Sequence, residues 1–192
     1  MGYTTDFDGA WAVTPPLTEP HRDYLAAFSR TRRMRRDPLI AAAFPDPVRR
    51  AAGLPIGDDG GYFVGTAPDN AMDPHDPFGQ DHDASILDYN QPPSGQPGLW
   101  CQWVPTHHVP SGHIEWDGGE KFYDYTDWIA YLIGHFLEPW GYTLNGEVRW
   151  FGEDREDFGV IRIVGNVVTS GTGTIIYPTL GRGEVGTITR TP

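Results

Sequence analysis

The segment TDWIAYLIGHFLEPW, residues 126–140, places the strongest constraint on how this chain can fold. Its large apolar side chains recur in pairs every four residues, which puts them on one face of an α-helix. Asp124 or Thr126 can cap the start of this helix, and Pro139 with Gly141 can end it. A helix of this kind packs against a second layer, so the pattern predicts a layered domain. Its apolar face consists of Trp128, Ile129, Leu132, Ile133, Phe136 and Leu137.

Alternating or continuous apolar patterns on both sides of that helix predict strands. Residues 3–13 show a clear alternation, which is typical of a strand with one buried face. The link Gly165-Asn166 between the last two patterns favours a tight hairpin. The predicted order is strand, helix, long loop, two strands, helix and three strands. The later strand patterns cover residues 99–105, 112–125, 143–151, 158–164 and 166–177.

A first helix is predicted from Thr18 to Asp37. Thr18 is a suitable N-cap residue, and the acidic residue and proline that follow it suit a first helical turn. A residue that precedes proline is disfavoured in the helical region, so the helix has to end before Pro38. A short second helix is predicted at 46–52, between an aspartate with a following proline and a glycine.

These elements predict an α+β protein with an antiparallel or mixed sheet and two main helices on one face. The first topology is a ferredoxin-like core extended by a C-terminal β-meander, and the alternative is a curved α+β sheet of another strand order. With 192 residues, the chain is long enough to bury its own core. We expect one domain over residues 1–180, with a long Gly/Pro/Asp-rich loop insertion at about 54–98, followed by a C-terminal tail at 181–192.

The charge balance excludes some partners, and the single cysteine indicates a compartment. The formal net charge of −12 argues against non-specific binding of nucleic acid or of anionic membranes. Cys101 alone cannot form an internal disulfide framework, which suits a reducing compartment. No segment is apolar enough to cross a bilayer, and the first residues do not resemble a secretory signal. We therefore expect a soluble cytoplasmic protein.

The stretch IEWDGGEKFYDY combines four carboxylates, four aromatic side chains and one lysine. A three-residue Asp-Gly-Gly turn avoids placing Glu115 opposite Glu120, and it sets Glu115 opposite Lys121 instead. That register predicts a hairpin whose outer face carries Glu115, Lys121 and Tyr123. This face is either a solvated surface with a weak ion pair or a polar site.

Arginines gather in the stretch SRTRRMRRDP. On a continuous helix, Arg32, Arg35 and Arg36 would share one face because they lie three and four positions apart. Guanidinium groups recognise phosphate or carboxylate with two parallel hydrogen bonds. We expect this cluster, with Arg33, either to hold an anionic ligand or to pair with the acidic loop at 58–88 and clamp it.

The segment GQPGLWCQWVP, residues 95–105, carries two indoles that would face opposite sides of a strand. Trp100 and Gln102 would lie on one side, and Trp103 with Cys101 on the other. This pattern indicates either burial on both sides or an exposed stacking platform. Cys101 lies in an apolar strand without a defined basic partner, so a nucleophilic role is not expected.

No metal ion or cofactor is expected. The polar segment DPHDPFGQDHD, residues 73–83, has neither the spacing of an EF-hand loop nor that of a zinc-binding helix. The segment GRGEVG, residues 181–186, matches G-x-G-x-x-G, but too few residues follow for the helix that a dinucleotide fingerprint needs. The chain also lacks a P-loop and a G-x-S-x-G motif, so no catalytic motif is identified.

Several long motifs resemble a known family. They are GYTTDFDG, TRRMRRD, GQPGLWCQWVP, IEWDGGEKFYDYTDWIAYLIGHFLEPWGYTLNGEVRWFGED and DFGVIRIVGNVVT. In these stretches the chain is similar to a family of small proteins of unestablished function from bacterial genomes, including actinobacterial ones, and from tailed phages. The resemblance implies a soluble accessory protein of a phage-linked or mobile genome in a bacterial host. It carries over no catalytic residues.

Together these features favour a non-enzymatic protein that binds a small anionic, nucleotide-like ligand. One alternative is an acidic inhibitor that binds a host protein or mimics nucleic acid. Another is an enzyme that acts on a nucleotide-like substrate through Glu115, Lys121 and Tyr123. The candidate ligand-binding residues are Arg32, Arg33, Arg35, Arg36, Trp100, Gln102, Trp103, Glu115, Lys121 and Tyr123.

Overall fold

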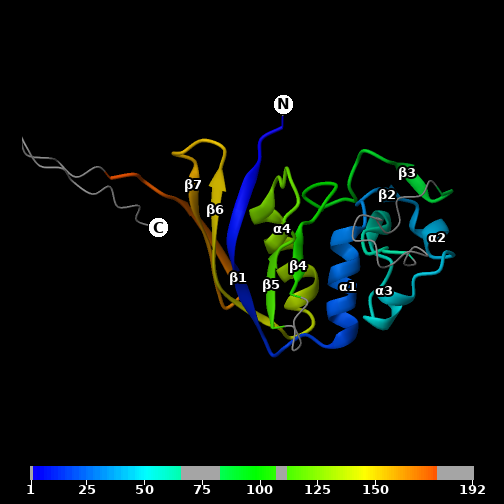
Figure 1. Ribbon diagram of the computed structural model, residues 1–192. Coiled ribbons are helices and arrows are strands. Elements are labelled where there is room, and N and C mark those ends of the chain that lie inside the picture. Colours follow the sequence, from blue (N-terminus) through cyan, green and yellow to red (C-terminus); the bar gives the residue numbers. More distant parts are fainter. Residues whose placement is uncertain (1, 66–82, 107–111, 177–192) are drawn as a thin grey trace, which may run out of the picture.

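The computed structural model describes residues 2–65, 83–106 and 112–176 and has an α+β fold (Figure 1). The strands are β1 (Thr5–Thr14), β2 (Arg35–Arg36), β3 (Ile86–Asp88), β4 (Trp103–Pro105), β5 (His113–Trp116), β6 (Thr143–Gly152), β7 (Phe158–Val164) and β8 (Val167–Thr172). The α-helices are α1 (Glu19–Arg30), α2 (Pro38–Ala41), α3 (Pro47–Ala51) and α4 (Tyr125–Leu132). A 3₁₀ turn, η1 (Asp58–Gly60), and a π-helical turn, η2 (Ile133–Leu137), complete the elements.

Six strands form one antiparallel sheet in the order β4-β5-β1-β6-β7-β8, and β2 pairs with β3 separately. β1 lies inside the sheet, where it pairs with β5 on one side and with β6 along its whole length on the other. Its alternation suits this position, because Trp11 and Val13 are buried while Asp6 and Asp8 are exposed. The predicted α+β class with an antiparallel sheet is therefore confirmed.

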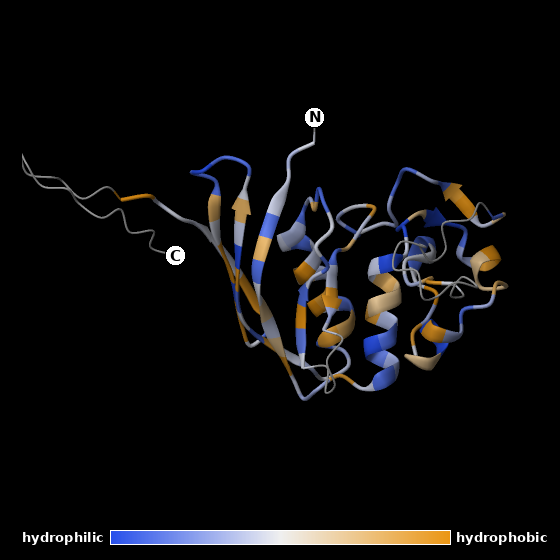
Figure 2. Ribbon diagram, in the orientation of Figure 1, coloured by the Kyte–Doolittle hydropathy of each residue, from blue (hydrophilic) through white to orange (hydrophobic). Residues whose placement is uncertain are grey.

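Helices α1 and α4 pack their apolar faces into a single core with the sheet. Phe28 of α1 meets Trp128 of α4 edge to face with ring centroids 6.1 Å apart, and Tyr24 meets Phe136 at 5.2 Å. In Figure 1, α1 lies alongside β4. Helix α4 contacts β8. Figure 2 shows hydrophilic and hydrophobic residues alternating along β1 and β6, as expected for strands with one buried face.

The helix predicted at 126–140 is confirmed, although its second part has an unusual form. α4 begins after Asp124, whose φ is 53°, and it continues directly into the π-helical turn η2. In that turn the N–H of Glu138 donates to the carbonyl oxygen of Ile133 at 2.9 Å, five residues back. Phe136 and Leu137 remain fully buried across this change. The apolar face thus stays on the core through the wider turn.

Helix α1 ends at Arg30, which corrects the longer helix predicted from the sequence. Thr31 is extended, and its hydroxyl donates to the carbonyl oxygen of Ala27 at 2.8 Å, so it closes the last turn. The N–H of Arg33 then donates to the carbonyl oxygen of Leu99 at 2.9 Å. The arginines beyond α1 therefore lie on an extended segment and share no helix face.

The hairpin predicted within IEWDGGEKFYDY is wrong. β5 pairs with β4, which sets Trp116 opposite Trp103 and Glu115 opposite Val104. The chain after Trp116 is a loop in which Lys121 has a φ of 60°. Glu115 and Lys121 therefore do not face each other across two strands.

Aromatic packing around Phe7 of β1 explains this pairing. The ring of Phe7 meets four rings edge to face, at centroid distances between 4.9 and 5.8 Å. Two of these rings come from β4 and β5, and the other two come from the loop and from the first residue of α4. Such contacts outweigh a surface ion pair, which is worth at most about 1 kcal/mol. The four rings belong to Trp103, Trp116, Phe122 and Tyr125.

The insertion predicted at 54–98 is packed against the rest of the chain where the structure describes it. Phe63 and Val64 are buried, and β3 pairs with β2. Residues 66–82 and the predicted tail at 181–192 lie outside the described residues. Among the described helices, none combines the length and the apolar character needed to span a membrane.

Candidate functional site

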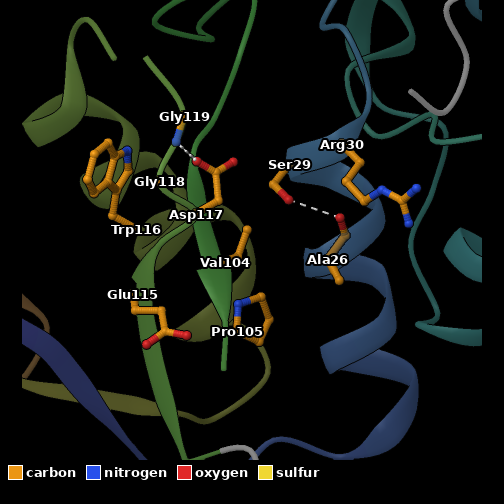
Figure 3. A pocket seen from close by; sticks show the side chains of 10 residues that line it. All are labelled: Ala26, Ser29, Arg30, Val104, Pro105, Glu115, Trp116, Asp117, Gly118 and Gly119. Atoms are coloured by element: carbon orange, nitrogen blue, oxygen red, sulfur yellow. Dashed lines mark hydrogen bonds between the residues drawn. The ribbon is translucent and has the colours of Figure 1, made fainter. Parts of the chain in front are cut away.

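A cavity of about 450 Å³ lies between α1 and the β4–β5 pair (Figure 3). One wall comes from the last two turns of α1, and the other comes from β4, from β5 and from the turn that follows β5. Carboxyl groups and apolar side chains both line it. The lining residues are Ala26, Ser29, Arg30, Val104, Pro105, Glu115, Trp116, Asp117, Gly118 and Gly119.

The tight turn after β5 gives this cavity part of its acidic lining. Gly118 has a φ of 84°, in the left-handed region that favours glycine. Asp117 Oδ1 accepts a hydrogen bond from the N–H of Gly119 at 2.8 Å, which forms an Asx turn. A Cβ on Gly119 would lie 3.0 Å both from that oxygen and from Gln102 Cδ. The close approach in this turn therefore depends on glycine.

Gln102 holds the turn from the β4 side. Its Oε1 accepts a hydrogen bond from Trp116 Nε1 at 3.0 Å, and its Nε2 donates to the carbonyl oxygen of Glu120 at 3.0 Å. Its backbone carbonyl oxygen accepts from the N–H of Asp117 at 3.0 Å. Gln102, a predicted ligand-binding residue, thus makes its contacts within the turn and orients the cavity wall.

Two carboxyl groups dominate the electrostatics of the cavity. Glu115 and Asp117 lie on its strand side, whereas the guanidinium group of Arg30 extends away from them on the other side of α1 (Figure 3). Loss of solvent raises the pKa of the Asp117 carboxyl group, and the hydrogen bond from Gly119 opposes this rise. Asp117 as a whole residue is exposed, so this rise reflects partial loss of solvent at its carboxyl group.

Arg33 of the predicted arginine cluster is a buried structural residue. Only 2% of its surface is exposed, and its guanidinium group lies 4.1 Å from the centre of the Phe28 ring. It donates to the carbonyl oxygens of Gly61 at 2.8 Å and of Phe63 at 3.1 Å, and to Gln96 Oε1 at 3.2 Å. These contacts tie the predicted insertion to the end of α1.

Arg36 and Arg35 also contact the insertion. Arg36 is 2% exposed and donates to Asp83 Oδ2 at 2.6 Å and to Ser85 Oγ at 2.7 Å. Arg35 forms an ion pair with Asp59 at 3.3 Å. For these two arginines, the alternative in which the cluster clamps the acidic loop is confirmed.

Arg32 lies against an aromatic surface away from the cavity. Its guanidinium carbon is 4.3 Å from the centre of the Tyr89 ring and 5.9 Å from that of Trp100. It also donates to the carbonyl oxygen of Tyr89 at 3.1 Å and to Asn90 Oδ1 at 3.2 Å. The structure thus brings Arg32 and Trp100 together, whereas Trp103 is buried in the core.

Lys121 and Tyr123 lie beside the N-terminal end of the described chain. A Cβ on Gly2 would be 2.7 Å from Lys121 Cε and 3.2 Å from Tyr123 Oη. Both side chains are exposed, and they come from the loop that follows the cavity turn. Glu115 lines the cavity, and neither Lys121 nor Tyr123 is among its lining residues. The three residues predicted to share one hairpin face are therefore not aligned in that way.

Within the described ranges, the side chains do not form a metal-binding cluster or an activated thiol. No cluster of three or more His, Cys, Asp or Glu side chains there could hold a metal ion. The polar segment at 73–83 lies outside the described residues except for Asp83. Cys101 is fully buried, and this burial raises the pKa of its thiol to about 12.

Sequence reasoning found one acid of the cavity and missed the other. The sequence pattern predicts Glu115 as a ligand-binding residue and places Asp117 only in the turn. The Asp-Gly-Gly sequence directly after a strand was the available signal, because an Asx turn uses one carboxyl oxygen and leaves the other for a ligand. No sequence pattern identifies Ser29 of α1 as a cavity residue, because its position there depends on the packing of α1 beside β4.

Comparison of the chain with protein-family models, with curated proteins and with solved structures finds no match. The chemistry of the cavity and the contacts of the arginine segment are therefore the basis for a functional interpretation.

Proposed function

We propose that this protein is a non-enzymatic binding protein whose cavity between α1 and β4–β5 takes a positively charged group on an apolar stem. A lysine or arginine side chain of a protein partner has this chemistry. One observation carries the proposal, namely that Glu115 and Asp117 line a cavity that is otherwise largely apolar. The apolar part of its wall includes Ala26, Val104, Pro105 and Trp116.

The charge of the whole chain supports a basic partner. With a formal net charge of −12, the protein attracts cationic surfaces over distances of about 10 Å at moderate salt. At the cavity, a guanidinium or ammonium group would form hydrogen bonds to carboxylate, which contribute about 1.5–3 kcal/mol each. This is the acidic protein-binding role, and it fits the accessory protein of a phage-linked genome that the family resemblance implies.

A peptide pair tests the proposal. The probe is a short peptide rich in arginine, and its control has citrulline at the same positions, which keeps the shape and removes the charge. Backbone amide shifts of Gly118 and Gly119 report on the cavity. We expect the arginine peptide to move these two signals and to bind more weakly as salt increases. The citrulline peptide should leave them unchanged.

A pair of double variants separates the cavity from the overall charge. Glu115→Gln with Asp117→Asn removes two charges from the cavity. Glu138→Gln with Glu156→Gln removes two exposed charges elsewhere. The cavity pair should weaken binding of the arginine peptide by about tenfold or more, which corresponds to about 1.4 kcal/mol. Equal weakening by both pairs, or no binding by the unmodified protein, would contradict the proposal.

A second candidate is the small anionic, nucleotide-like ligand. The position of Arg32 over Tyr89 and near Trp100 supports it, because a nucleobase can stack on an indole beside a guanidinium group. Arg33 and Arg36 make buried contacts within the chain, so this ligand would depend on Arg32. Titration with adenosine monophosphate tests it, and Arg32→Gln should abolish any shift of the Trp100 indole signal. The absence of such a shift in the unmodified protein would exclude this candidate.

We also propose that the first part of the fold is a ferredoxin-like core. Its elements would be β1, α1, β4, β5, α4 and β6, and β7 with β8 would extend the sheet as a meander. The strand order β4-β5-β1-β6 supports this assignment, since it is the order of a split β-α-β arrangement with two crossing helices. An experimental structure with the same strand order and right-handed crossings would test it.

A further inference from the structure

Strand β8 is an edge of the six-stranded sheet, and no other strand pairs with its outer side in the described part of the chain. Five of its six residues are exposed. From Ile163 to Ile176 the chain has no charged side chain and no proline, and the register of β8 with β7 has no shift. Natural sheet edges are usually protected by charge, proline, a bulge or a covering element. In its described surroundings β8 lacks charge, proline and a bulge, and the helix that contacts it is α4, whose first residues Tyr125 and Thr126 line a pocket with Ser170, Gly171 and Thr172.

The hydrogen bonds with β7 identify the backbone groups at this edge. The N–H of Gly173 donates to the carbonyl oxygen of Phe158 at 2.7 Å, so this residue faces β7. Successive residues of an antiparallel ladder alternate between facing the partner and facing away. The N–H and C=O groups of Val168, Ser170 and Thr172 therefore point outward. This edge carries both donors and acceptors.

The opposite edge of the sheet is built differently. β4 has three residues and ends at Pro105, and α1 lies alongside it. Proline and a covering helix are both common protections of an edge strand. The contrast indicates that pairing is prevented at β4 and permitted at β8.

We propose that β8 pairs antiparallel with β8 of a second copy of this chain about a two-fold axis at Ser170. The two sheets then form one continuous sheet. Ser170 faces its counterpart, and Val168 of one copy faces Thr172 of the other. Because the same edge of both copies is used in this contact, assembly through it stops at the dimer.

Exposed apolar side chains at both ends of the strand support this partner. Val164 and Val167, at the hairpin tip, are each 65% exposed, and Ile176 is 74% exposed. Positions 164 and 176 are equally far from Ser170 along the sequence. An axis at Ser170 therefore brings Ile176 of one copy beside the hairpin tip of the other, and both lose water contact.

The charge distribution also favours this edge. Two copies with a formal net charge of −12 repel each other wherever charged surfaces meet, and the uncharged strand reduces that repulsion. Two paired strands of six residues bury less than the roughly 1,200 Å² of a standard stable interface. We therefore expect a dissociation constant in the micromolar range, and tighter association at higher salt, where repulsion is screened. Binding of a basic partner has the opposite salt dependence.

Sedimentation velocity from low to high micromolar concentration tests the proposal. The unmodified protein should change from monomer to dimer, with a larger dimer fraction at higher salt. Ser170→Pro should remain monomeric, because proline removes an outward donor and no hydrogen bond to β7. Ser170→Ala is the matched control and should dimerise normally. Ser170→Lys, which places like charges at the axis, gives the same test if proline perturbs the fold.

Amide exchange identifies what covers the edge. In the dimer, the amides of Val168, Ser170 and Thr172 should exchange slowly, and dilution should make them fast. An unmodified protein that stays monomeric at every concentration would overturn the proposal. Slow exchange of these three amides in a monomer would also overturn it, since the same chain would then cover β8. A dimer that persists in both Ser170→Pro and Ser170→Lys would assign the interface elsewhere.

Discussion

Arg33 donates a hydrogen bond to the carbonyl oxygen of Gly61 at 2.8 Å, although 28 positions separate the two residues in the sequence. The same guanidinium group reaches Phe63 and Gln96, so one side chain connects the end of α1 with both sides of the insertion. A run of arginines that resembles an anion site in sequence therefore acts, at this position, as an internal support. The cavity that carries the proposed function is built by other residues.

The first prediction concerns this support. Arg33→Met should destabilise the protein by about 2–4 kcal/mol, because the buried carbonyl oxygen of Phe63 and Oε1 of Gln96 lose a donor, while that of Gly61 keeps its hydrogen bond from Gln96 Nε2. Arg35→Met is the control, since the Arg35 side chain is 47% exposed and its ion pair with Asp59 is worth about 0–1 kcal/mol. Urea unfolding of both variants measures the difference. Similar losses in the two would refute a special role for Arg33.

The elements that sequence patterns predicted correctly are those whose side-chain period repeats over many residues. The alternation in β1 and the paired apolar residues of α4 each extend over ten or more residues, counting η2. The last hairpin was also predictable, because Gly165 and Asn166 have φ values of 56° and 69°, as a two-residue turn of this type needs. Local geometry alone determines these features.

The errors occurred where a distant residue decides the structure. Local charge pairing favours a hairpin that sets Glu115 opposite Lys121. In the structure β5 pairs with β4 instead, and Trp103 and Trp116 on these two strands both pack against the ring of Phe7. Similarly, the arginines suit a helix, yet Arg33 is buried in an extended segment, where its N–H donates to the distant carbonyl oxygen of Leu99. The candidate site was predicted only in part for the same reason, since its second wall is α1 and sequence patterns do not reveal that neighbour.

The second prediction compares the same substitution at two glycines. Gly60 has a φ of 70°, and an added Cβ would lie 2.7 Å from the Cβ of Arg36. Gly60→Ala should therefore cost roughly 2–4 kcal/mol through left-handed strain and crowding. Gly134 is exposed in a helical turn, and an added Cβ has no neighbour within 4 Å. Gly134→Ala should be neutral or stabilise by up to about 1 kcal/mol. Thermal unfolding of both checks the sign.

The third prediction concerns the single thiol. Because burial raises the pKa of Cys101 to about 12, only about one thiol in 10⁴ is ionised near pH 8. The folded protein should react with a disulfide reagent such as dithiobis(nitrobenzoate) only as fast as it opens, while the chain in denaturant should react at once. Reaction of the folded protein at the rate of a free thiol would show that Cys101 is accessible.

The fourth prediction uses the raised pKa of Asp117 and rests on the proposed function. A cation needs the ionised carboxylate, so affinity for the arginine peptide should rise as pH increases through the elevated pKa of this acid. The ordinary pKa of aspartate is about 3.9, and the folded protein keeps its proton above that value. In Asp117→Asn, this part of the pH dependence should disappear. Calorimetric titrations at a series of pH values measure both profiles.

The same shift has the opposite consequence for stability in the absence of the peptide. Between the ordinary and the elevated pKa, the folded state holds a proton on Asp117 that the unfolded chain has released, so the free energy of unfolding falls as pH rises. Asp117→Asn should lack this fall. Comparing unfolding of the two proteins over that interval therefore provides a check that does not depend on any ligand. If the two stability profiles run parallel while their binding profiles differ, Asp117 contacts the cation without being perturbed by the fold. If the binding profiles also coincide, the cavity is not where the peptide binds.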